Sequence, residues 1–288
     1  MRDRGLREHR KQIAQETLRI LKQGYYTTPS GRRIDISNAQ KNSEDASYLL
    51  TPDEGLALKE MYSPGNTLDR PFQKPDMHFE VANISTITAI TNSRSSENSL
   101  AVLNFASARN PGGGFLNGSM AQEEALAYSS GLYNIQIRHM EYYKKNRAYD
   151  LMTYTDHAIY SPDVVFFRDA DFRLLEEPVL ASVLTLPAVN MAQVRAKGEN
   201  IDFSMQVMEN RMCLALSILA SEKNKTIILG AYGCGVFGNN PNNVARWWKE
   251  LLIDVGYSSY FDTVLFAVLD KPYGENITAF KRVFEGAT

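Results

Sequence analysis

Three runs of nearly continuous apolar residues constrain the fold more than any other feature of this sequence. They lie at residues 100–106, 226–233 and 261–270, and each is rich in Val, Ile, Leu or Phe. Strands covered on both faces of a sheet have this composition, whereas strands with one wet face alternate apolar and polar residues. Because predicted helices separate the runs, the sequence indicates an α/β fold in three layers, αβα.

Periodicity and turn residues predict the other elements. Further strands are expected at 78–83, 162–169 and 179–186. Helices are expected at 6–23, from Thr51 onward, and at 85–91, 119–140, 202–221, 241–255 and 274–285. Residues 62–75 hold three prolines, one glycine and no periodicity. We therefore predict a linker there, with an N-terminal accessory region at 1–75 and the main domain at 76–288.

The charge balance argues against a protein that coats nucleic acid. The chain has 31 Lys and Arg against 33 Asp and Glu, for a net charge of −2, so no sequence-specific nucleic-acid partner is expected. Residues 1–33 differ, with nine basic and three acidic residues. This local excess has two interpretations: a basic arm that meets a polyanion, or an ordinary solvated helix face.

Several site types and locations are excluded by what the sequence lacks. Two cysteines, Cys213 and Cys234, are too few for a disulfide framework or a Cys-rich zinc site. The four histidines have no metal-ligand spacing, so neither a metal nor another cofactor is expected. No apolar run is long enough to cross a bilayer, and the N-terminus has no apolar signal region. We expect no membrane partner and a cytoplasmic protein, or a nuclear one if the source is eukaryotic.

The first loop that we expect to carry function spans residues 106–124. Gly112, Gly113 and Gly114 permit close approach of backbone N–H groups to an anion or a sugar. Ser119 is predicted to cap the next helix, with Gln122 completing a capping box. Glu123 and Glu124 then follow in the first turn, where acids also simply favour the helix dipole. The helix end lowers a carboxyl pKa, whereas a neighbouring acid or bound phosphate raises it, so the residues alone leave the balance open.

The second loop spans residues 229–241 and contains the pattern G-x-G-x-x-G at 233–238. Such loops bind pyrophosphate through a tight turn and a helix N-terminus. A nicotinamide-dependent dehydrogenase would also need an acid roughly 20 residues further on. The next predicted strand ends at Asp270, 32 residues beyond Gly238. We therefore keep phosphate binding, with a glycine-rich turn shaped only for packing as the alternative, and exclude the dehydrogenase.

Together, these loops resemble a known family. Residues 104–133, with GGG, seven residues and then QEE, are similar to the signature of poly(ADP-ribose) glycohydrolases (PARG). The similarity is greatest to the compact microbial-type branch, whose catalytic unit is an ADP-ribose-binding macrodomain. Residues 230–239 resemble the macrodomain loop around the diphosphate, and 24–36 resemble the branch's accessory segment. The resemblance implies a macrodomain with a mixed, mostly parallel sheet and an N-terminal helical accessory region.

The resemblance also implies roles for individual residues. Glu124 is the implied catalytic acid and base, Glu123 the partner of ribose hydroxyls, and Gln122 a support of the loop. The implied ligand is poly(ADP-ribose) or ADP-ribose, carried by ADP-ribosylated proteins. The residues implied to bind it are Asn104, Asn110, Gly112, Gly113, Gly114, Gly233, Cys234, Gly235, Val236 and Phe237.

Three alternatives stay open. The chain could instead hydrolyse mono-ADP-ribosylated proteins or ADP-ribose esters, because the same loops would serve. It could also be a reader that binds ADP-ribose without cleaving it, although a reader has no need of two adjacent carboxylates. Cys234 could be a nucleophile, but a cysteine between two glycines is more often simply small enough for the turn. At the adenine end, position alone suggests Ile84, Ser85 and Asn190.

Overall fold

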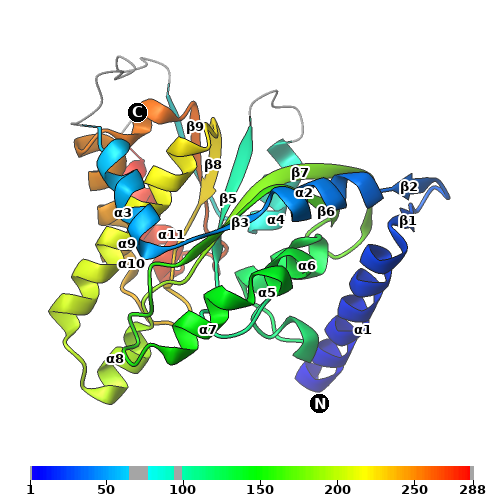
Figure 1. Ribbon diagram of the computed structural model, residues 1–288, viewed down its shortest axis with the longest axis horizontal. Helices are drawn as coiled ribbons and strands as arrows, with labels where there is room; N and C mark the ends of the chain where they lie inside the picture. Colours follow the sequence, from blue (N-terminus) through cyan, green and yellow to red (C-terminus); the bar gives the residue numbers. More distant parts are fainter. Residues whose placement is uncertain (1, 65–76, 94–98, 286–288) are drawn as a thin grey trace.

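The computed structural model describes residues 2–64, 77–93 and 99–285, and a seven-stranded sheet lies at its centre (Figure 1). The strand order is β3-β6-β7-β5-β8-β9-β4. The strands are β3 (Tyr48–Leu50), β4 (His78–Ala82), β5 (Leu100–Phe105), β6 (Ala158–Arg168), β7 (Leu174–Leu186), β8 (Thr226–Leu229) and β9 (Thr263–Ala267). Most of the predicted linker lies outside the described residues.

The sheet is mixed and mostly parallel, as expected. β7, β5, β8, β9 and β4 pair in parallel, with Leu103 opposite Leu184 and Val102 opposite Ile228. β6 pairs antiparallel with β7, and β3 pairs antiparallel with β6. Because parallel strands share a direction, the loops after β4, β5, β7, β8 and β9 emerge at one edge of the sheet.

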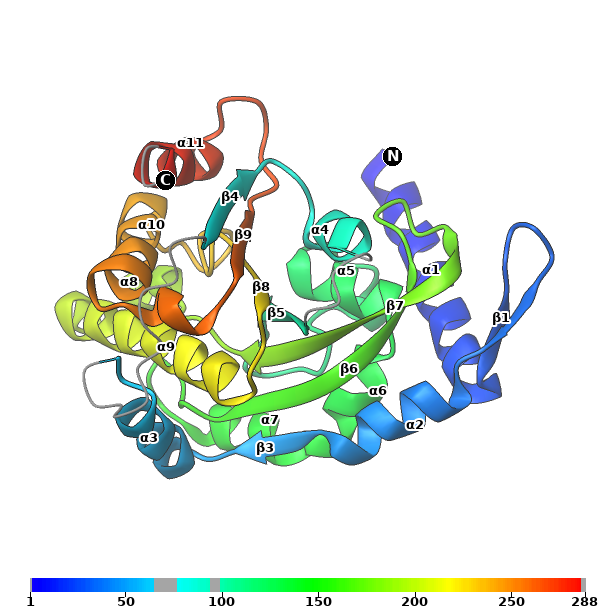
Figure 2. The same cartoon turned by 90° about the horizontal axis from the view of Figure 1, so that it is seen from above.

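Helices cover both faces of the sheet, which confirms the three-layer αβα architecture (Figure 2). Alternate residues of each strand enter different cores: Leu103 and Ile227 pack on one side, Val102 and Ile228 on the other. The first core includes side chains of α8 (Met191–Lys197), α9 (Ile201–Ser221), α10 (Pro241–Lys249) and α11 (Glu275–Phe284). The second includes α4 (Thr86–Asn92), α5 (Gln122–Ser129) and α6 (Leu132–Gln136).

The N-terminal region packs against the sheet rather than apart from it. Its helix α1 (Arg2–Gln23) lies beside α5, and buried Thr17 donates a hydrogen bond to the Tyr128 carbonyl at 2.8 Å. A small hairpin follows, β1 (Tyr25–Thr27) with β2 (Arg33–Asp35), and then α2 (Ser37–Ala46) and α3 (Pro52–Met61). β3, from the same region, is an edge strand of the main sheet. The division at residue 75 stays a prediction.

The helix expected at 119–140 is wrong, because the chain breaks into α5, α6 and α7 (Met140–Ala148). Ser130 is extended, with φ −149° and ψ −179°, and forms a β-bridge with Phe166. Its hydroxyl also donates to the Leu126 carbonyl, so the side chain replaces part of the helical hydrogen bonding.

Other differences concern polar or proline-containing segments. The strands expected to begin near Pro162 and Val179 both begin earlier. β6 continues through Pro162 because the register shifts between Ser161 and Val164 and accommodates the proline. α2 and β3 were not predicted, since the α2 segment is almost entirely polar and β3 has three residues. α8, with seven residues, was also too short to stand out. No helix in the described ranges is long and apolar enough to cross a membrane.

Candidate active site

A cavity of about 360 Å³ lies at the carboxyl edge of the sheet, and both glycine-rich loops contribute to its lining, the first through Met120, Ala121 and Gln122. The glycines at 112–114 and the glutamates at 123 and 124 are not among the lining residues. Phe105 at the end of β5, Ala267 at the end of β9 and Ala188 after β7 form its floor. Its walls come from the start of α4, the start of α5 and the loop after β8. The wall residues are Ser85, Thr86, Met120, Ala121, Gln122, Ala125, Ala231, Gly233, Gly235, Val236, Phe237, Val268, Leu269 and Asn276.

Glu124 lies in the first turn of α5 and is 8% exposed. Its Oε1 atom accepts a hydrogen bond from the Gly114 N–H at 2.7 Å. Within the described residues, its other carboxylate oxygen receives no hydrogen bond. The glycine loop thus holds one oxygen of Glu124 and, among the described residues, no donor holds the other.

Glu123 is buried more deeply, at 4% exposure, and three donors surround its carboxylate. Oε2 accepts from the Ser107 N–H at 2.7 Å. Oε1 accepts from Gln136 Nε2 at 2.9 Å and from Asn104 Nδ2 at 3.3 Å. The side chain therefore has one orientation, defined by β5, α6 and the loop between β5 and α5.

Burial raises the pKa of Glu123 to about 8. The three donors oppose this rise, because they favour the ionised form, and the neighbouring Glu124 adds to it. For Glu123, burial therefore outweighs the three donors, a balance that the residues alone left open. A carboxyl group with such a pKa exchanges a proton near neutral pH.

The triple glycine approaches both carboxylates closely. A Cβ atom built on Gly113 would lie 2.5 Å from Glu124 Oε1 and 3.0 Å from Glu123 Oε2. Gly112 and Gly113 also adopt left-handed backbone conformations, with φ of +62° and +58°. Any larger residue at 113 would meet both carboxylates, so glycine is required there for space as well as conformation.

Gln122 supports the loop, but the predicted capping box is wrong. Gln122 Nε2 donates to the Leu103 carbonyl, and its Oε1 accepts from the Phe105 N–H, both at 2.9 Å. The start of α5 is thereby tied to the end of β5. The N-cap residue is Ala121 rather than Ser119, and it makes no side-chain cap. Ser119 instead lies against Gly114, whose carbonyl accepts its N–H.

The second loop forms the opposite wall of the cavity. Gly233 and Gly238 have φ of +71° and +66°, and a Cβ on Gly233 would lie 2.6 Å from Asn239 Nδ2. Gly235, Val236 and Phe237 line the cavity, and Val236 is 88% exposed. Phe237 is half-buried, 6.2 Å from the Tyr154 ring. Of the residues predicted to bind a diphosphate, Gly233, Gly235, Val236 and Phe237 thus line the cavity and Cys234 does not.

Cys234 is part of the turn, and its environment disfavours a nucleophile. Burial raises the pKa of its thiol to about 12. Its sulfur lies 3.7 Å from the Tyr232 carbonyl oxygen. The thiol is therefore protonated at neutral pH, in agreement with the interpretation that cysteine is there because it is small.

The two asparagines occupy different places. Asn104 is fully buried beneath Glu123, where its Nδ2 also donates to Thr185 Oγ1 at 3.2 Å. Asn110 is exposed, and its backbone carbonyl accepts from the Gly113 N–H. Of the positions suggested for adenine, Ser85 lines the cavity. Asn190 instead caps α8 through its side-chain oxygen.

Sequence reasoning missed Gln136, which is fully buried behind the site. Its Nε2 donates to Glu123, and its Oε1 accepts from the Gly112 N–H at 2.8 Å. One carboxamide thus joins the acid to the glycine loop. In a continuous helix, Gln136 would lie roughly 20 Å from Glu123. Gln136 lies beside Glu123 only because the helix is interrupted at Ser130.

Within the described ranges, no three His, Cys, Asp or Glu side chains are grouped to hold a metal ion. The carboxylates instead engage the N–H donors described above. Backbone N–H groups and the side-chain amides of Asn104 and Gln136 are the donors around the two glutamates.

Comparisons with known proteins agree with this geometry. The family described as "Microbial-type PARG, catalytic domain" matches residues 14–169. A poly(ADP-ribose) glycohydrolase structure from Thermomonospora curvata, bound to the inhibitor ADP-HPD, is 36% identical with a TM-score of 0.87. The match covers 96% of this chain and 99% of that one.

A second similar structure is the enzyme from Deinococcus radiodurans in complex with ADP-ribose. It is 36% identical with a TM-score of 0.78, and the match covers 86% of this chain and 97% of that one. No curated protein matches the sequence. From the family match and these two similarities, we conclude that the chain belongs to the microbial-type PARG family.

Proposed function

We propose that this protein is a glycosidase that hydrolyses the ribose–ribose bonds of poly(ADP-ribose) and releases ADP-ribose. One observation carries the proposal: two adjacent buried glutamates are held by N–H groups of one loop, and their neighbours on α5, Gln122 and Ala125, line a cavity to which a second glycine-rich loop contributes. The relatives support it, because their structures are those of poly(ADP-ribose) glycohydrolases bound to ADP-ribose or ADP-HPD.

In this proposal, Glu124 is the general acid and base. Its protonated form gives a proton to the departing ribose oxygen, and its carboxylate then activates water against an oxocarbenium-like centre. The Gly114 N–H holds one carboxylate oxygen at 2.7 Å, so the other can face the bond. The fixed position suits proton transfer, which requires hydrogen-bond distance to the reacting oxygen.

Glu123 has a binding role in the same proposal. Its carboxyl group is fixed by three donors and has a pKa near 8, so it can accept from, or donate to, a ribose hydroxyl. Gly112 to Gly114 would pass beneath the terminal ribose, and Asn110 would contact it. Asn104 would act from beneath, through Glu123.

The loop after β8 would bind the diphosphate. Backbone N–H groups of Gly233, Cys234, Gly235 and Val236 are the proposed donors, and Phe237 would pack on the terminal ribose. A turn with left-handed glycines at 233 and 238 can direct successive amides toward an anion. The physiological substrates would be poly(ADP-ribosyl)ated proteins, with the cytoplasm as the proposed compartment.

The test is to incubate purified protein with automodified poly(ADP-ribose) and, separately, with mono-ADP-ribosylated protein, and to measure released ADP-ribose. Polymer loss with the mono-modified protein intact is expected. Release from mono-modified protein alone would favour an ADP-ribosyl or ADP-ribose-ester hydrolase. Binding of ADP-ribose without any release would favour a reader.

A further inference from the structure

Four arginines follow the edge of the loop that carries Gly112 to Gly114. Arg7 and Arg10 come from α1, Arg147 comes from α7, and Arg109 lies in the loop itself. Arg7 Nε donates to the Asn117 carbonyl and Arg10 Nε to the Gly118 carbonyl, both at 2.8 Å. At the start of the loop, Arg147 Nε donates to the Arg109 carbonyl at 2.7 Å. We call these four residues the arginine collar.

The collar lacks the acidic partners that several other arginines of this chain have. Arg138 pairs with Glu44 and Asp45, for example, and Arg246 pairs with Glu250. Within the described ranges, no carboxylate lies within ion-pair distance of a collar guanidinium. Only the Nε atoms of Arg7, Arg10 and Arg147 are engaged in hydrogen bonds there. Their terminal nitrogens stay available, and Arg7, Arg109 and Arg147 are exposed.

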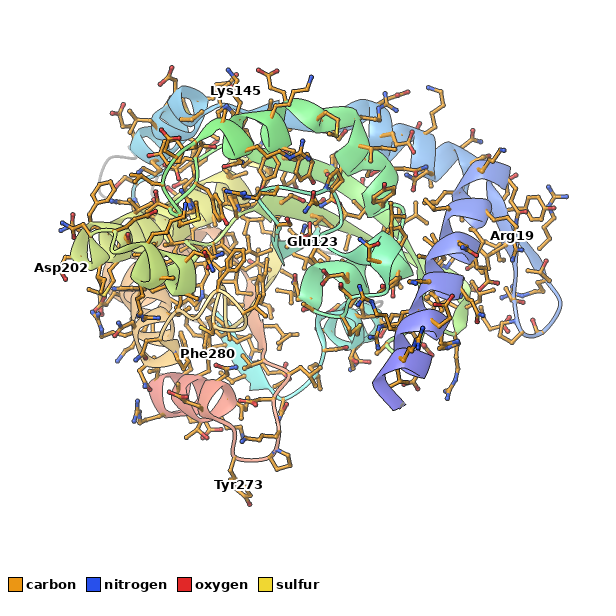
Figure 3. All side chains as sticks on the ribbon, turned by 90° about the horizontal axis from the view of Figure 1, so that it is seen from below. Arg19, Glu123, Lys145, Asp202, Tyr273 and Phe280 are labelled. Carbon is orange, nitrogen blue, oxygen red and sulfur yellow. The ribbon has the colours of Figure 1, made fainter. Side chains whose placement is uncertain are left out.

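The collar lies close to the two glutamates. Arg7 and Arg10 bind the carbonyls of Asn117 and Gly118, three and four residues after Gly114, whose N–H binds Glu124. Arg147 binds the carbonyl of Arg109, two residues after Ser107, whose N–H binds Glu123. In Figure 3, Glu123 lies between α1, which carries Arg19, and the helix that carries Lys145. Both flanks of the loop therefore carry unpaired positive charge.

The proposed substrate supplies the matching charge. Each ADP-ribose unit carries two phosphates. In the proposed function, the rest of the polymer begins at the oxygen that Glu124 protonates, and Glu124 is bound by the loop that the collar follows. Arginine forks bind phosphate through two parallel N–H···O bonds. We propose that the arginine collar binds the pyrophosphate of the ADP-ribose unit on the leaving side of the cleaved bond. This inference rests on the proposed function and adds a second subsite to it.

The test compares polymer cleavage by an Arg7→Gln/Arg10→Gln variant and an Arg109→Gln/Arg147→Gln variant. Arg19→Gln is the matched control, because Arg19 lies on α1 but pairs with Glu16 at 3.6 Å. We expect kcat/KM on long polymer to fall at least about tenfold in each double variant, because charge-assisted bonds to phosphate are removed. The slope of log kcat/KM against log salt concentration should become shallower by about 0.7 for each phosphate that is no longer bound. The affinity for free ADP-ribose should change by less than about twofold.

An Arg7→Lys/Arg10→Lys variant separates charge from anchoring of α1, because it keeps both charges and removes the Nε bonds. It should retain the wild-type salt dependence. Unchanged kcat/KM and salt dependence in both glutamine variants would overturn the proposal. The proposal would also be overturned if single-stranded DNA inhibited the wild type but not the glutamine variants, while the variants still cleaved polymer like the wild type. Failure of the wild type to cleave polymer would instead refute the proposed function.

Discussion

Gly113 is the residue at which the backbone and both glutamates meet most closely. Gly113→Ala should lower kcat/KM by about 100-fold, because displacing catalytic groups by about 1 Å costs that much. The new methyl group would lie 2.5 Å from Glu124 Oε1, and the backbone has φ of +58°. The free energy of unfolding should also fall by about 1–3 kcal/mol. Steady-state kinetics and urea unfolding measure the two effects.

Gly198→Ala separates backbone strain from contact with the carboxylates. Gly198 has φ of +68°, but a Cβ there would meet no atom within 4 Å. Gly198→Ala should therefore lower the free energy of unfolding by about 1 kcal/mol, the usual penalty for a left-handed non-glycine residue, and should leave the activity unchanged. Equal reductions of activity in the two variants would contradict the role given to Gly113.

The raised pKa of Glu123 predicts a specific pH dependence of stability. Its folded-state pKa is about 8 against an ordinary value of 4.5, so between these values the folded protein binds a proton that the unfolded chain does not. The contribution of Glu123 to the free energy of unfolding is fully present below pH 4.5 and is lost as the pH rises through 8. The slope is about −1.4 kcal/mol per pH unit within that window.

Urea unfolding of the wild type and Glu123→Gln from pH 5 to 9 measures this effect. The difference in unfolding free energy should change steadily across the window, because the amide does not titrate. Parallel curves for the two proteins would show that Glu123 is ionised throughout.

At this scale, the residues themselves predicted the paired glutamates and both glycine loops, because their chemistry is local. The surroundings of Glu123 could not be predicted. Gln136 reaches it from a separate helix, and Asn104 approaches from the strand beneath. A buried carboxyl's pKa depends on such distant neighbours.

At the scale of elements, the junction between α5 and α6 depends on Gly131. A Cβ there would lie 1.7 Å from Gln40 Oε1, a buried side chain of α2. Gly131→Ala should therefore destabilise the protein by about 1–3 kcal/mol, as overpacking usually does. Because Gly131 has φ of −79°, backbone strain does not contribute.

A double-mutant cycle with Gln40→Ala identifies the cause. In the Gln40→Ala background, Gly131→Ala should cost almost nothing, since the colliding side chain is gone. The same cost in both backgrounds, measured by urea unfolding, would place its origin elsewhere.

Apolar strands and amphipathic helices were predictable because burial imposes a periodic pattern on the sequence. The interruption at Ser130 was not, since it results from a bridge to Phe166, 36 residues away in sequence. α2 was also missed, because its polar sequence has no such pattern and it packs on β6 through few buried residues. Local pattern thus located most elements but not the junctions that shape the site.

At the scale of the whole molecule, the site is formed by both ends of the described chain. α1 holds the far end of the glycine loop, and the residues after β9 line the cavity opposite. The sequence predicted a basic N-terminal helix but not its position against α5. That position comes from long-range interactions, such as the hydrogen bond between Thr17 and Tyr128.

The central claim is that Glu124 performs the proton transfers while the two loops bind the ligand. Its most direct test measures polymer hydrolysis and ADP-ribose binding with the same preparation of Glu124→Gln. Hydrolysis should fall by about 1,000-fold or more, as expected when a general acid and base is removed. Calorimetry should show a Kd for ADP-ribose within about threefold of the wild type. Retained hydrolysis by a variant with the wild-type melting temperature would contradict this role of Glu124.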